Sequence, residues 1–269
     1  MTQRGIGTAL IILLGMVFPT RAEAQGLLWQ LPADGSEVVY GGTMTQVNTR
    51  PDGQESTMTW ERQLAIRSVG QEQATVDDEQ VPARWIEFEL RTGQASEQGV
   101  DTGLVGLRIF RVLVPEAAIT GKPADDRDIP NAFLPILQGF QQIGDQPAQP
   151  LEGKAFAIAP LLTQLRNYRG DQLKAEGEEP VDVPAGQFTA TKYTASETQE
   201  NRSTRIENAA TMFVSKDVPF GLARWQVTTT QSVKDPNQPR DAFEARTRIE
   251  ATMEARAINQ NAQATLQAP

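Results

Sequence analysis

The feature that most limits the fold of this chain is a regular alternation of apolar and charged residues over positions 242–257. Phe243, Ile249 and Met253 lie at odd positions with smaller residues between them, whereas Glu and Arg occupy most even positions. Glu, Ala, Arg and Met favour helices by intrinsic propensity. Apolar residues of a helix recur every three or four positions, however, and those of a strand every two. The alternation therefore predicts a strand whose odd positions are buried.

Two further segments, 57–68 and 84–91, alternate in the same way. Their apolar faces hold Met58, Trp60, Leu64, Ile66, Ile86, Phe88 and Leu90. A third segment, 104–114, is apolar on both faces, which is typical of a central strand. The remaining strand candidates are 37–47, 187–195, 205–216 and 222–233.

Between residues 115 and 186 the alternation disappears. Asp128 is suited to cap a short helix over 129–142, and Pro160 is suited to the first turn of a second helix that ends at Gly170. The tail beyond Ile258 is rich in Asn, Gln and Ala, so we expect it to be disordered. Polar loops are expected at 69–82, 146–150 and 176–180.

These elements predict a single mainly β domain over residues 25–257, of the α+β class. About eight long antiparallel strands form a sheet that must curl, because a large twisted sheet does not stay flat. The result is a half-barrel whose concave, apolar side is covered by the short helical insert 115–186 as a lid. The alternative is a β-sandwich with the insert as an external loop.

The amino terminus has the pattern of a secretory signal peptide. Arg4 provides the positive region, residues 6–18 the apolar region, and Ala22 and Ala24 the small residues before a cleavage site. The apolar run is shorter than the roughly 20 residues that span a bilayer. Cleavage after residue 24 removes Arg4, Arg21 and Glu23, which leaves 23 basic and 33 acidic residues and a net charge of −10. No transmembrane span is then expected.

The composition excludes several classes of function. The chain has no Cys and no His, so disulfides, thiolate nucleophiles and imidazole or thiolate metal sites are absent. A strongly acidic chain is repelled by phosphate backbones, so no nucleic-acid partner is expected. No cofactor or metal is implied. Export without disulfides is typical of a bacterial envelope, so we expect a periplasmic or secreted protein.

Two short motifs carry a family resemblance. Residues 183–188 read Val-Pro-Ala-Gly-Gln-Phe, and residues 212–222 read Met-Phe-Val-Ser-Lys-Asp-Val-Pro-Phe-Gly-Leu. Their Pro and Gly residues predict one turn into a strand and one between two strands. The pattern resembles uncharacterised exported bacterial proteins similar to the lipoprotein-localisation factors. That resemblance implies an envelope half-barrel with a helical lid that binds acyl chains or lipidated proteins, and it assigns no binding residue.

Two arginines lie on apolar strand faces, Arg62 in the segment 57–68 and Arg111 in the segment 104–114. A buried guanidinium needs hydrogen-bond partners. Each arginine therefore either reaches water at the sheet edge or meets the lid or an anionic ligand head group. The predicted ligand-lining residues are Trp60, Arg62, Leu64, Ile66, Ile86, Phe88, Leu107, Ile109 and Arg111.

Three functions remain open at this point. The first is an exported, non-enzymatic envelope protein that binds a lipid or an acylated protein in an apolar concavity. The second is a structural or protein-interaction module whose concavity is filled core. The third is a glycan hydrolase with two carboxylates facing each other in a cleft.

The signal peptide gives the first testable prediction. The small residues at Ala22 and Ala24 place the start of the mature chain at Gln25. Amino-terminal sequencing of the exported protein should therefore begin with Gln-Gly-Leu-Leu. An intact amino terminus recovered from the membrane fraction would contradict it.

Overall fold

The computed structural model describes residues 26–97, 99–120, 134–168 and 171–267. Its main element is one antiparallel sheet of twelve strands, in the order β10-β11-β12-β13-β14-β1-β2-β3-β5-β7-β8, with β4 paired to β3. The sheet is open, with β10 and β8 at its two ends. The strands are β1 (Glu37–Thr49), β2 (Glu55–Val76), β3 (Glu79–Ser96), β4 (Gly99–Asp101), β5 (Leu107–Pro115), β7 (Gln138–Ile143), β8 (Gln149–Pro150), β10 (Leu173–Val183), β11 (Gly186–Glu200), β12 (Thr204–Val214), β13 (Leu222–Val233) and β14 (Glu244–Asn259).

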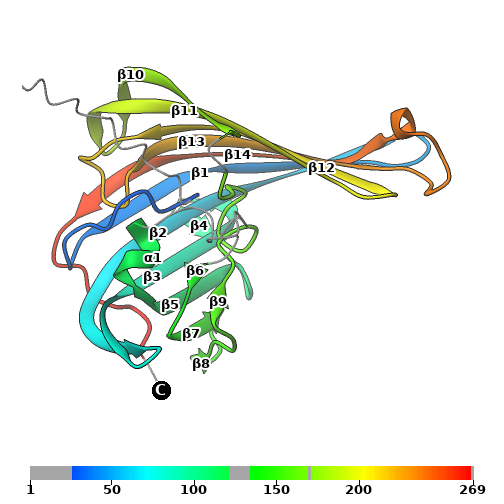
Figure 1. The fold of residues 1–269 in the computed structure, drawn as a ribbon. Helices are drawn as coiled ribbons and strands as arrows, with labels where there is room; N and C mark the ends of the chain where they lie inside the picture. The colour runs from blue at the N-terminus through cyan, green and yellow to red at the C-terminus, as the bar shows by residue number, and fades with distance from the viewer. Residues whose placement is uncertain (1–25, 98, 121–133, 169–170, 268–269) are drawn as a thin grey trace, which may run out of the picture.

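The sheet bends strongly, so that β10 and β11 lie above β5, β7 and β8 in the view of Figure 1. The mainly β class is confirmed, and one sheet holds every described strand except β6 (Leu134–Pro135) and β9 (Ala155–Phe156), which pair with each other. The predicted count of eight strands was too low, and the sandwich is not observed in the described residues.

Two predicted loops are strands. Residues 69–82 belong to β2 and β3, which turn at Asp77 and Asp78, both with positive φ. Residues 176–180 lie within the edge strand β10. Both regions are largely exposed, so neither buries a face that would impose alternation on the sequence.

The predicted helices of the insert are wrong. Residues 134–142 contain β6 and most of β7, while 128–133 lie outside the described residues. Residues 160–168 form turns and extended backbone, although their leucines have helical spacing. The one described α-helix of the insert is α1 (Glu116–Thr120). Pro135 and Gly139 disfavour a helix, and tertiary contacts outweigh the leucine spacing.

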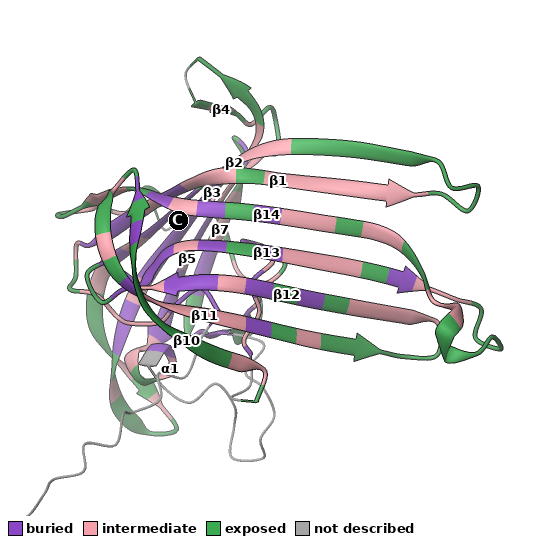
Figure 2. Cartoon of the chain, turned by 90° about the horizontal axis from the view of Figure 1, so that it is seen from above, coloured by how far each residue is buried: buried purple, intermediate pink, exposed green. Residues whose placement is uncertain are grey.

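The last long strand, β14, is confirmed. Ala251, Met253 and Ala255 are buried at odd positions, as the alternation predicted. The ends of β1, β2, β11, β12, β13 and β14 that lie farthest from the bend form an extended part of the sheet, called here the arm. The amino-terminal half of β14 is less buried because it lies in this arm. Figure 2 shows mostly exposed and intermediate residues along this arm, apart from short buried stretches of β12 and β13, and more buried residues near the bend.

Both predicted turns of the family-like motifs are confirmed. Gly186 begins β11 with φ 140° directly after the turn from β10. Phe220 and Gly221, with φ 61° and 96°, form the connection from β12 to β13. A Cβ on Gly221 would lie 2.7 Å from Cβ of Trp29, so both its φ and its surroundings require glycine.

The predicted disordered tail is wrong for the residues that the structure describes, because β14 continues to Asn259 and Leu266 is buried against the sheet. Leu266 is 1% exposed and packs with Ile109 and Phe140. The backbone N–H groups of Thr265 and Leu266 donate to the two carboxylate oxygens of the fully buried Glu87, each at 2.9 Å. Polar composition predicts disorder only when no partner supplies such contacts.

The docked tail gives a prediction of stability. Leu266→Ala removes the buried side chain, and we expect the free energy of unfolding to fall by about 2 kcal/mol, the lower end for a buried leucine because a chain end relaxes easily. Gln267→Ala, at the exposed neighbouring position, is the matched control and should change it by less than about 0.5 kcal/mol. Equal denaturant midpoints for the two variants would contradict the docked tail.

Candidate functional site

The inner face of the sheet is the face that packs on residues 151–168, called here the covering segment. Cross-strand register places Ile66 opposite Phe88 and Phe88 opposite Phe110 on this face. The ring of Phe156 lies 5.6 Å from that of Phe88 and 5.1 Å from that of Phe110, centre to centre. The inner face is therefore covered where it is most apolar.

Four of the predicted lining residues form this packed core. The side chains concerned are Leu64, Ile66, Ile86 and Phe88, each 0% exposed. They lie on the inner face as predicted, but the covering segment packs on them, so they do not line an open cavity. Trp60 and Arg62 lie farther along β2, where the covering segment leaves a cavity.

The other three predicted residues lie on the opposite, outer face. Because Phe110 pairs with Phe88, the inner face of β5 holds Phe110 and its even-numbered neighbours. Leu107, Ile109 and Arg111 point outward instead. β5 is apolar on both faces, so alternation gave no means of choosing between them.

Arg111 contacts the docked tail. Its guanidinium lies 4.9 Å from the ring centre of Trp85, and its Nη1 donates to the carbonyl of Leu266 at 3.2 Å. Its Nε is buried with no hydrogen-bond partner in the described structure. The residue thus helps to hold the carboxyl-terminal tail and does not face the inner side of the sheet.

Polar side-chain contacts at Arg62, Asn208 and Glu197 anchor the covering segment to the sheet. Arg62 Nη2 donates to the carbonyl of Leu162 at 2.8 Å. Tyr168 Oη donates to Oδ1 of Asn208 on β12 at 2.5 Å, and burial raises the pKa of Tyr168, which keeps the hydroxyl protonated. Arg166 pairs with Glu197 on β11 at 3.2 Å. The segment is therefore fixed to strands on both sides of the bend.

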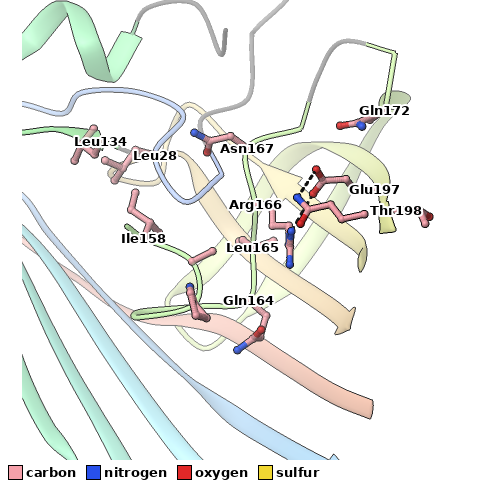
Figure 3. Close-up of a pocket in the computed structure, with 13 residues that line it drawn as sticks. Leu28, Leu134, Ile158, Gln164, Leu165, Arg166, Asn167, Gln172, Glu197 and Thr198 are labelled. Carbon is pink, nitrogen blue, oxygen red and sulfur yellow. Dashed lines mark hydrogen bonds and ion pairs between the residues drawn. The ribbon is translucent and has the colours of Figure 1, made fainter. Parts of the chain in front are cut away.

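A first cavity of about 510 Å³ lies beside the covering segment, toward β11. Figure 3 shows Leu28, Ile158 and Leu165 near the apolar side, with polar residues toward β11. The Arg166–Glu197 pair balances the charges there. The other lining residues are Leu134, Ala159, Pro160, Gln164, Asn167, Gln172, Thr198 and Gln199.

A second cavity, of about 600 Å³, lies on the other side of residues 160–164. Trp60 and Arg62 line it, together with Arg108, which the sequence reasoning missed. Arg108 lies two residues before Phe110 and therefore on the same inner face of β5. The sequence did not reveal this, because both faces of β5 carry apolar residues. The apolar residues that line the second cavity are Met44, Trp60, Leu90, Val105, Pro160 and Leu161.

The charged residues that line the second cavity are Arg62, Arg108 and Asp101. Arg62 is 6% exposed, and its burial, followed by the nearby charge of Arg108, lowers its pKa to about 10. Arg62 therefore remains charged at neutral pH. In the described residues no group of three carboxylates gathers in a way that suits a metal ion.

Comparisons with known proteins give limited information. No family model and no curated protein matches the sequence. A "putative exported protein with YmcC-like fold" from Bacteroides fragilis aligns with 87% of this chain and 100% of its own, at 11% identity and a TM-score of 0.30. A "putative lipoprotein" from Parabacteroides distasonis aligns with 88% and 100%, at 9% identity and a TM-score of 0.34. Scores this low carry no inference about function.

The described part of the chain contains no helix that is both long and apolar enough to cross a membrane.

The anchoring of the covering segment can be tested at Tyr168. Tyr168→Phe leaves the buried Oδ1 of Asn208 without its donor, and we expect a loss of about 1–3 kcal/mol in the free energy of unfolding. Tyr193→Phe is the matched control on β11. The half-buried Tyr193 hydroxyl forms no hydrogen bond with the described residues, so the loss should stay below about 0.5 kcal/mol. Equal losses in denaturant melts would contradict the anchor.

Proposed function

We propose that this chain is an exported envelope protein that binds a lipid-like or acylated ligand on the inner side of its curved sheet, without catalysis. The observation that supports the proposal best is the second cavity. Its volume of about 600 Å³ lies in the usual range for small-molecule sites, about 300–1,000 Å³. Trp60, Leu90 and Leu161 give it an apolar lining that suits an acyl chain.

The proposed ligand position differs from the predicted one. The centre of the inner face is packed by the covering segment, so the ligand occupies the Trp60 end of the sheet. Leu104 and Val105, 85% and 66% exposed, lie in the loop before β5, and Val105 belongs to the cavity rim. Exposed apolar residues at a rim provide a path for a chain to enter from a membrane or a carrier.

Export is part of the proposal and is supported by the amino-terminal signal pattern. The positive residue Arg4, the apolar run 6–18 and the small residues before Gln25 are those of a secretory leader. A periplasmic or secreted location follows from it, and an acylated protein or free lipid is the partner class that such a location offers.

A second function, as a protein-interaction module of the envelope, is favoured by the packed interior. Leu64, Ile66 and Phe88 act as ordinary core residues. Under this alternative the arm of the sheet, whose residues are largely exposed, would be the contact surface. A carboxylate-based hydrolase has less support. The first and second cavities are each lined by a single carboxylate, Glu197 and Asp101, and the two carboxylates that line a third hollow, Glu97 and Asp101, are both exposed.

The two functions are separated by tryptophan fluorescence. A neutral long-chain alcohol carrying a terminal bromine should quench the emission of Trp60, because the cavity brings the bromine into contact with this ring. In Trp60→Phe the quenching should largely disappear. Trp85→Phe is the matched control on the outer face and should leave it unchanged. The absence of saturable quenching in the wild-type chain would favour the interaction module.

A further inference from the structure

Register brings two guanidinium groups into the second cavity from opposite sides of β3. Arg62 on β2 pairs with Thr92, and Arg108 on β5 pairs with Leu90, two residues earlier on the same face of β3. Both arginines line the cavity, and the charge of Arg108 acts on Arg62. Two like charges therefore share one partly enclosed space.

Neither arginine forms an ion pair with a described carboxylate. Arg62 donates to Thr92 Oγ1 at 3.3 Å, to the sulfur of Met44 at 3.8 Å and to the Leu162 carbonyl at 2.8 Å. Asp101 also lines the cavity, but its Oδ1 accepts a hydrogen bond from the backbone N–H of Gly103 at 3.1 Å. Thioether sulfur is a weak acceptor, so the donor capacity of the guanidinium is only partly used.

The other well-buried arginines of the described chain are paired with carboxylates. Arg84, 4% exposed, pairs with Glu116 at 2.8 Å. Arg67 pairs with three carboxylates, those of Glu37, Glu87 and Glu89. This is the expected arrangement, because an uncompensated buried charge is costly. The half-buried Arg111 also lacks a described carboxylate partner, but its guanidinium lies against the Trp85 ring and donates to the Leu266 carbonyl. Arg62 and Arg108 differ from it because they share one cavity.

We infer that the second cavity binds the anionic head group of an amphiphile between Arg62 and Arg108. The inference rests on the proposed function and names its ligand class: a single acyl or alkyl chain ending in a carboxylate or phosphate. The oxyanion accepts hydrogen bonds from the unused guanidinium N–H groups. The chain lies along Met44, Trp60 and Leu161. This arrangement gives the two arginines an anionic partner and covers the apolar lining at the same time.

The test compares four probes by isothermal titration calorimetry on the full mature chain. The probes are dodecanoate, dodecyl phosphate, dodecanol and inorganic phosphate. We expect both anionic amphiphiles to bind at least about tenfold more tightly than dodecanol, since hydrogen bonds to charged groups are among the stronger ones. Inorganic phosphate, which lacks a chain, should bind far more weakly than dodecyl phosphate.

Arg108→Gln is the diagnostic variant, because Arg108 is only half-buried and does not anchor the covering segment. It should lose about tenfold in affinity for dodecanoate and keep its affinity for dodecanol. Arg256→Gln, at an exposed position of β14 where the side chain pairs with Glu254, is the control and should change neither. An unchanged melting temperature in both variants shows that the fold is intact.

The outcomes separate the inference from the function on which it rests. Equal binding of dodecanoate and dodecanol, unaffected by Arg108→Gln, overturns the anion site and leaves the lipid-binding function standing. Failure of every dodecyl probe overturns both. If inorganic phosphate binds as tightly as dodecyl phosphate, the alkyl chain contributes nothing. The amphiphile inference is then overturned, and the two arginines form a site for a free anion.

Discussion

The packing of the covering segment against the inner face of the sheet is the interaction on which the rest of the structure depends. An open sheet with one apolar face is stable only if that face is removed from water. Phe156 and Leu162 supply the apolar contacts, while Arg62 and Tyr168 tie the segment to strands that lie far apart along the sheet. Both cavities are bounded by this segment, because Pro160 and Gln164 line each of them.

The outer face is stabilised by a different interaction, a network of buried charges and hydrogen bonds around Glu87. Glu87, fully buried, accepts hydrogen bonds from Arg67 and from two backbone N–H groups of the carboxyl-terminal tail. The neighbouring Glu89 is buried, which opposes its negative charge. Hydrogen bonds and charge from Arg67 and Arg91 nevertheless lower the pKa of Glu89. The two faces of the same strands thus solve the problem of buried charge in two ways. On the outer face Arg67 pairs with carboxylates, whereas the two arginines of the second cavity have no ion pair with a described carboxylate.

Much of the sheet could be predicted from the sequence, because a face that is half-buried imposes a two-residue period. β14 was predicted against its helical propensity for that reason. The period fails where both faces are exposed, as at residues 176–180, or both apolar, as in β5. Trp60 and Arg62 could therefore be assigned to the inner face, whereas Arg108 could not. The irregular backbone of the covering segment could not be predicted, because the spacing of its leucines indicates a helix and only tertiary contacts determine its path.

The central claim is that the second cavity holds an anionic acyl ligand in the cell envelope. Native mass spectrometry of the protein, isolated by mild extraction from the envelope of cells that export it, tests this claim most directly. The account predicts a mature chain that carries one additional species of acyl mass, released as an anion on activation. A mass equal to that of the bare mature chain, or one that reveals only a bound protein, would contradict it.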